Sequence, residues 1–135
     1  MKSTLLGGLS PRVFLHEYWQ KKPLLIRGAF PGFTGLLSPG DIMELACRDD
    51  AQSRLVTRKH GLWQVRHGPF MPRSFSGLPP AKWTLLVQDV NHFLPSARAL
   101  LLEFNFIPHA RLDDLMVSIA TDGGAGASAD LMRAL

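Results

Sequence analysis

A short glycine-bearing link between two β-prone runs constrains the fold of this chain more than any other feature. Residues 55–57 (LVT) and 62–65 (LWQV) are rich in β-branched, apolar and aromatic side chains, and the link Lys59-His60-Gly61 separates them. Two such runs joined by a short link of this kind predict a β-hairpin. A third run, residues 83–88 (WTLLVQ), predicts a buried strand. The centre of the chain is therefore expected to be built from strands.

Helices are expected around these strands. Ser-Pro pairs at residues 10–11 and 38–39 predict two helix starts, because serine caps a helix and proline suits its first position. The first helix should end near residues 21–22, and the second carries Asp41 at the position of a capping box. A third helix is expected over residues 96–104, behind Pro95. This mixture of helices and strands predicts an α+β fold.

Two further strands and two loops complete the expected elements. Residues 24–26 (LLI) predict a short strand, and residues 28–35 and 71–81 predict loops from their glycines and prolines. Residues 113–120 (DDLMVSIA) predict a strand in which side chains alternate between two faces. Met116 and Ser118 should then lie on one face of that strand, and Leu115, Val117 and Ile119 on the other.

Composition excludes several classes of protein. The 135 residues suffice for one domain, and 46% hydrophobic with 19% charged residues is typical of a folded chain. No apolar run approaches the roughly 20 residues that span a bilayer, so a membrane protein is not expected. The single cysteine, Cys47, excludes a disulfide scaffold and favours a reducing cytoplasm. We expect Cys47 itself to be a small core residue inside the second helix.

The net charge of +4 is unevenly distributed. Residues 1–67 contain ten Lys/Arg and five Asp/Glu, whereas residues 68–135 contain five Lys/Arg and six Asp/Glu. A basic first half favours an RNA-rich or acidic partner, but an ordinary solvated surface is the simpler interpretation. The sequence has no basic run or ladder of stacking aromatics that would strengthen a nucleic-acid interpretation.

No catalytic or metal-binding motif can be identified from spacing alone. The five histidines lack the spacing that brings metal ligands together, so each is interpreted as structural or surface: His16, His60, His67, His92 and His109. His67 is the best candidate for burial, with its ring bonded to backbone. The carboxylate pair Asp113-Asp114 could bind a cation or act in acid–base chemistry, but a solvated strand start is the simpler alternative.

Four segments, in this order, resemble one protein family: HEYWQKKPLLIRGAF, SRLVTRKHGLWQVRHGPF, WTLLVQDVNHF and RLDDLMVSIA. Together they are similar to the N-terminal part of the bacterial ribosomal oxygenases. The resemblance implies a JmjC-type, cupin-like fold, of which the chain would supply an incomplete double-stranded β-helix (a jelly roll). It also implies an Fe(II)- and 2-oxoglutarate-dependent dioxygenase that hydroxylates an arginine of a large-subunit ribosomal protein. Two histidines and one carboxylate hold the iron in such enzymes.

The chain departs from the family where the first iron ligands are expected. In the family, the strand that matches residues 113–120 leads into a turn of the form PGGGVGPHxD, whose His and Asp bind iron. Residues 122–130 of this chain are DGGAGASAD. Aligned on Asp130, Ser128 stands in place of the histidine; aligned without a gap, Ala129 and Leu131 occupy the ligand positions. We therefore expect residues 1–121 to be the N-terminal part of a JmjC/cupin-like domain and residues 122–135 to be a divergent Gly/Ala-rich tail.

The expected function follows from this departure. With the histidine, the later strands and the family's dimerisation region missing, the chain is expected to be a truncated member without catalytic or metal-ligand residues, inactive alone. The strand that precedes the metal turn still offers substrate-binding candidates, since acidic side chains suit an arginine: Asp113, Asp114, Met116 and Ser118. The alternative is a non-catalytic module that binds a ribosomal protein or RNA, which the basic first half would favour.

Overall fold

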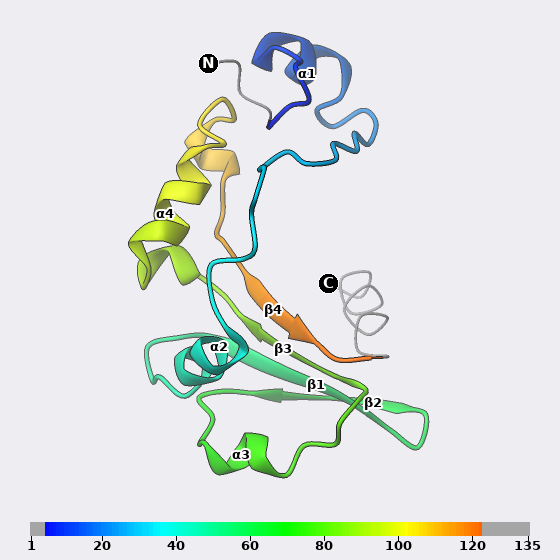
Figure 1. Ribbon diagram of the computed structural model, residues 1–135, viewed down its shortest axis with the longest axis vertical. Helices are drawn as coiled ribbons and strands as arrows, with labels where there is room; N and C mark the ends of the chain where they lie inside the picture. Colours follow the sequence, from blue (N-terminus) through cyan, green and yellow to red (C-terminus); the bar gives the residue numbers. More distant parts are fainter. Residues whose placement is uncertain (1–4, 123–135) are drawn as a thin grey trace. The chain divides into compact units, whose positions relative to one another are not determined.

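The computed structural model describes residues 5–122, in which short helices accompany one antiparallel sheet (Figure 1). The chain divides into two compact units, the first ending at Gly35 and the second beginning at Leu36. The predicted α+β composition is confirmed. The predicted domain boundary after residue 121 lies next to residues that the structure does not describe, so it stays a prediction.

The first unit contains helix α1 (Pro11–Glu17), which begins where the Ser-Pro pair predicts. The Ser10 hydroxyl accepts a hydrogen bond from the backbone N–H of Val13 at 3.2 Å. The helix ends at Glu17 rather than near residues 21–22, so the predicted end is wrong. Gln20 adopts a positive φ of 59°, which a continuing right-handed helix does not allow.

The strand predicted at residues 24–26 is also wrong. These residues form no ladder, and the Leu25 side chain is 76% exposed. A strand requires a neighbour for its backbone groups, and no strand lies within the described residues of this unit. The glycine- and proline-rich residues 28–35 form a loop, as predicted.

The second unit begins with helix α2 (Pro39–Ala46), whose first turn carries the predicted capping box. The Ser38 hydroxyl accepts from the Asp41 N–H at 3.2 Å, and the Asp41 carboxylate accepts from the Ser38 N–H at 3.0 Å. Ile42 and Ala46 are buried. Cys47 is the C-cap rather than an interior helix residue, and it packs half-buried against the core.

The predicted hairpin and buried strand form the centre of the sheet. Strands β1 (Ser53–Lys59) and β2 (Leu62–His67) are joined by His60 and Gly61, both with positive φ, as tight hairpin turns require. Strand β3 (Trp83–Val87) is buried along its whole length. The order of the four antiparallel strands is β2-β1-β3-β4, and they lie side by side in Figure 1.

Strand β4 (Val117–Ala120) is half as long as predicted. It pairs with β3 only from Val87↔Val117 to Thr84↔Ala120. Beyond Val87, the segment that follows β3 turns at Asp89, whose φ is 54°. It then continues into the 3₁₀ turn η1 (Val90–His92). Within the described part of the chain, residues 113–116 therefore have no strand to pair with, although their sequence pattern predicts an extended strand.

Three short helical elements occupy the remaining connections. The predicted loop 71–81 contains helix α3 (Arg73–Ser76), in which Ser76 donates to the Arg73 carbonyl at 2.9 Å, so proline content was misleading there. Helix α4 (Pro95–Leu102) starts one residue before the predicted start and ends two residues before the predicted end. A second 3₁₀ turn, η2 (His109–Arg111), leads toward β4. None of the helices in the described part of the chain combines the length and apolar character that crossing a bilayer requires.

The main core lies on one face of the sheet, here called the helix-covered face. Side chains from β1, β3 and α2 join others from η1 and α4 in one buried cluster, which includes Leu55, Leu85, Val87, Ile42, Ala46, Val90 and Ala97. Leu115, Val117 and Ile119 pack against this cluster, whereas Met116 packs on the other face with Val56 and Leu86. The predicted alternation along residues 115–119 is thereby confirmed.

Candidate functional site

The opposite face of the sheet carries the side chains that alternate with the core. Directly paired residues share a face of an antiparallel sheet. The pairs Arg54↔His67, Arg54↔Leu86 and Leu86↔Ser118 therefore form one row across all four strands. Val56 and Leu86 are buried on this face, and Met116 packs against them. Two of the predicted substrate-binding residues, Met116 and Ser118, thus share a face with Arg54.

The other two candidates, Asp113 and Asp114, have different environments. The Asp114 carboxylate accepts a hydrogen bond from the backbone N–H of Asp89 at 2.9 Å, which holds the turn after β3. Asn91 similarly accepts from the Leu115 N–H at 3.0 Å. Asp113 is exposed and makes no hydrogen bond or ion pair within residues 5–122. The structure therefore gives Asp114 a structural contact and leaves the Asp113 carboxylate open to solvent.

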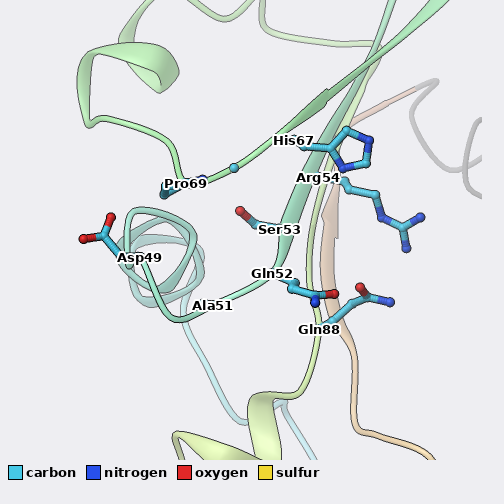
Figure 2. Close-up of a pocket in the computed structure, with 9 residues that line it drawn as sticks. Asp49, Ala51, Gln52, Ser53, Arg54, His67, Pro69 and Gln88 are labelled. Carbon is cyan, nitrogen blue, oxygen red and sulfur yellow. The ribbon is translucent and has the colours of Figure 1, made fainter.

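A cavity of about 310 Å³ lies where β1 begins and β2 ends. Figure 2 shows that the side chains of Gln52, Arg54, His67 and Gln88 project to the same side of the strands, away from Asp49. The backbone N–H of Gln88 donates to the Gln52 carbonyl at 2.9 Å, which keeps the two glutamines adjacent. We call these four side chains the amide–arginine cluster.

The sequence interpretation missed this cluster and misplaced one member of it. His67 is exposed, with no ring-to-backbone bond within the described residues, so its predicted burial is wrong. It closes β2, an edge strand whose residues are all exposed. A signal for Arg54 was present in the sequence. Because side chains alternate along β1, Arg54 lies on the face of the sheet that the core residue Leu55 does not share. His60 lies in the hairpin turn, and His92 Nε2 lies 4.0 Å from Asp89 Oδ1.

Two shifted carboxyl groups lie outside this cluster. Hydrogen bonds from the backbone and then the hydroxyl of Ser38 lower the pKa of Asp41. Arg48 donates from Nε and Nη2 to the two carboxylate oxygens of Asp50, both at 2.8 Å, and lowers the pKa of that carboxyl. The same hydrogen bonding raises the pKa of Arg48. These shifts follow from a helix cap and an exposed ion pair, so they do not mark a catalytic group.

The described side chains do not form a site for Fe(II). Within the described residues, no group of three or more His, Cys, Asp or Glu side chains is arranged to hold a metal ion. The family ligands are two histidines and a carboxylate, so the described residues do not fit the metal. The predicted substitution of the His-x-Asp pair concerns Ser128, Ala129, Asp130 and Leu131, which lie outside the described residues.

Comparison with known proteins identifies relatives for most of the chain. No protein-family model matches it. The chain is 41% identical over 111 residues to the ribosomal protein uL16 3-hydroxylase of Escherichia coli, and 42% identical over 118 residues to a probable ribosomal oxygenase of Haemophilus influenzae. These matches cover 82% and 87% of this chain but only 29% of each relative.

Solved structures give the same result. The Escherichia coli ribosomal oxygenase YcfD, in complex with cobalt and succinic acid, matches with a TM-score of 0.79 and 40% identity. A second structure of that protein, in complex with cobalt and 2-oxoglutarate, matches equally well. Each match covers 86% of this chain and 32% of the solved chain. Over most of its length, the chain is therefore related in sequence and fold to one part of the ribosomal oxygenases.

Proposed function

We propose that this chain is part of an Fe(II)- and 2-oxoglutarate-dependent hydroxylase that acts on an arginine of a large-subunit ribosomal protein in the cytoplasm. The observation that carries the proposal is the 41% identity to a ribosomal protein uL16 3-hydroxylase over 111 residues. The solved relative with cobalt and 2-oxoglutarate supports the class of metal and cosubstrate.

In this proposal residues 1–121 are the N-terminal part of a JmjC/cupin-like domain, and residues 122–135 are a divergent tail. The four-stranded sheet is the beginning of an incomplete double-stranded β-helix. The fold match at a TM-score of 0.79 supports the assignment of the sheet. A jelly roll consists of two sheets that face each other. The opposite face, with Val56 and Leu86 at its centre, is the face that a second sheet would cover.

The substrate side of the site is proposed to include Asp113, Asp114, Met116 and Ser118. Met116 and Ser118 lie on the opposite face, and the exposed Asp113 carboxylate can accept two parallel hydrogen bonds from a guanidinium group. Asp114 contributes by position, because its carboxylate already holds the backbone of Asp89. Of the two carboxylates, Asp113 is therefore the proposed contact for the substrate arginine.

The 135-residue chain is proposed to lack hydroxylase activity on its own. The described residues do not fit Fe(II), and the sequence at residues 122–130 has no histidine. A serine hydroxyl is a poor replacement for imidazole as an iron ligand, and one carboxylate alone does not retain the ion. The retained property is then recognition of the substrate rather than turnover.

The test combines binding and turnover on the purified full chain. A fluorescent peptide of uL16 that contains the candidate arginine is titrated with the chain, and polarisation is measured. Separately, the chain is loaded with Fe(II) without oxygen, mixed with 2-oxoglutarate and peptide, and aerated. Mass spectrometry then detects the gain of one oxygen atom, with the Escherichia coli uL16 3-hydroxylase as the positive control. We expect peptide binding without oxygen transfer.

A matched pair of variants tests the role of Asp113. Asp113→Asn should weaken peptide binding by about tenfold, which corresponds to loss of a charge-assisted pair. Glu103→Gln removes an exposed carboxylate at the end of α4 and should leave binding unchanged. Equal effects of the two variants would contradict a specific role for Asp113, and turnover by the unmodified chain would contradict the proposed inactivity.

The same titration, repeated with RNA, distinguishes this proposal from the alternative, a non-catalytic module that binds a ribosomal protein or RNA. Binding of RNA in preference to the peptide, with an affinity that falls steeply as salt rises, would favour an RNA-binding role. Absence of binding to both ligands would contradict both functions.

A further inference from the structure

Among the residues that the structure describes, Arg54 differs from the other arginines of the sheet in having no partner for its charge. Its Nε atom is buried and has no hydrogen-bond partner within the described residues. Arg58 lies over the Trp63 ring at 5.2 Å, and Arg66 lies over the Phe70 ring at 5.7 Å. Buried charged groups are normally paired. The unpaired Nε therefore points to a binding partner outside the described residues.

The neighbours of Arg54 are hydrogen-bond donors. His67 is its direct cross-strand partner, and Gln52 and Gln88 line the same cavity. The guanidinium group carries five N–H donors, each glutamine amide carries two, and the imidazole carries at least one. In Figure 2 these four side chains extend to the same side of the strands. Such a group of donors is complementary to an oxygen anion.

The acidic residues near the cavity do not neutralise Arg54. Asp49 lines the cavity, but Figure 2 places its side chain away from the amide–arginine cluster. The Asp50 carboxylate is already bonded to Arg48 through both oxygens. Within the described residues, no ion pair includes Arg54. The counter-charge must therefore come from a group outside the described residues.

From this arrangement we propose that the amide–arginine cluster binds a carboxylate group. One guanidinium matches the single charge of a carboxylate and its two coplanar oxygens, whereas a phosphate dianion would require a second fixed cation. The cavity of about 310 Å³ is larger than a bare carboxylate, so it has room for the body of an organic acid or for an acidic side chain. This proposal does not depend on hydroxylase activity.

The test uses the full chain with selectively ¹⁵N-labelled arginine, and the signal of the Arg54 Nε–H is assigned from its loss in the variants. Propionate is the probe, and propionamide is its neutral control of the same shape. We expect propionate to shift the Arg54 signal with a dissociation constant on the order of millimolar, and propionamide to leave it unchanged. Blocked glutamate, N-acetylglutamate amide, then represents an acidic side chain of a peptide.

Variants assign the binding to the cluster. Arg54→Gln should weaken propionate binding at least tenfold, measured by the shift of the His67 ring signals. Arg58→Gln, on the same strand and face, should leave it unchanged. Gln88→Glu places a carboxylate within the cavity, so it should compete with the probe and weaken binding to a similar extent. Circular dichroism spectra that match the unmodified chain confirm that each variant is folded.

The outcomes separate the sources of the carboxylate. Tighter binding of blocked glutamate than of propionate assigns the site to an acidic peptide segment, and the reverse assigns it to a free organic acid. Tighter binding of inorganic phosphate than of either carboxylate would overturn the charge argument. Equal binding of propionate and propionamide, or unchanged binding in Arg54→Gln, would overturn the site itself.

Discussion

The two faces of the sheet use the same strands for different purposes. On the helix-covered face, Leu55, Leu85 and Val87 are buried among side chains from α2, η1 and α4. On the opposite face, Val56 and Leu86 are buried, and the polar side chains of the amide–arginine cluster line a cavity. Because side chains alternate along a strand, adjacent residues such as Arg54 and Leu55 belong to different environments. If the proposed recognition is right, core packing and ligand contact fall to adjacent residues of the same strand.

The strongest test of this contrast replaces one residue on each face. Leu85 is completely buried in the main core, so Leu85→Ala should lower the free energy of unfolding by about 2–5 kcal/mol through lost burial and a residual cavity. Ser118 is exposed on the opposite face, and Ser118→Ala should change the free energy of unfolding by less than about 0.5 kcal/mol. Urea denaturation followed by tryptophan fluorescence measures both. Equal effects would mean that the two faces do not differ in their contribution to stability.

A second test concerns the backbone that borders the cavity. Gly68 follows β2, and its N–H donates to the Ser53 carbonyl at 2.9 Å. A Cβ atom there would overlap the Ser53 hydroxyl and lie 3.2 Å from two ring carbons of Phe70. Gly68→Ala should therefore destabilise the chain by about 1–3 kcal/mol through overpacking.

Gly77 provides the matched control for this substitution. It has a negative φ of −93°, and an added Cβ would meet no atom within 4 Å. Gly77→Ala should leave the urea midpoint unchanged or raise it slightly, because alanine restricts the unfolded chain. A loss of stability in Gly77→Ala as large as that in Gly68→Ala would contradict the steric explanation.

The sequence predicted local features better than pairings. The Ser-Pro helix starts, the hairpin at His60-Gly61 and the alternation along residues 115–119 all depend on contacts between near neighbours, and all are present. The strand at residues 24–26 and the first half of the strand at 113–120 were wrong, because each needs a partner strand that only the tertiary fold supplies.

The candidate site was predictable only in part. The alternation of β4 placed Met116 and Ser118 on one face, and family resemblance selected them. The amide–arginine cluster combines residues from β1, β2 and the segments that flank β1 and β3, and no local spacing brings these together. The different environments of Asp113 and Asp114 depend on the backbone of Asp89, which is 25 residues from Asp114 in sequence.

A third test separates these two carboxylates. Asp114→Ala leaves the part-buried N–H of Asp89 without its partner and should cost about 1–2 kcal/mol of unfolding free energy. Asp113→Ala removes an exposed side chain and should change the same quantity by less than about 0.5 kcal/mol. Asp114→Asn retains an oxygen that can accept the bond, so thermal unfolding should show partial recovery. A stability loss in Asp113→Ala that matches the loss in Asp114→Ala would show that the pair acts as one structural unit.

The smallest expected effect concerns the cap of α2, the helix that covers the core. The Ser38 backbone N–H and hydroxyl lower the pKa of Asp41 from its ordinary value of 3.8. A lowered folded-state pKa means that the ionised carboxylate stabilises the fold above the unfolded-state pKa, and that this contribution is lost as pH falls through the folded-state pKa.

Asp41→Asn should therefore unfold at lower urea concentration than the unmodified chain near neutral pH. The difference between their midpoints should stay constant down to pH 3.8 and shrink below it. Asp50, whose pKa is also lowered, titrates equally in both proteins and cancels in the comparison. A difference that persists unchanged well below pH 3.8 would assign the effect to the shape of the side chain rather than to its charge.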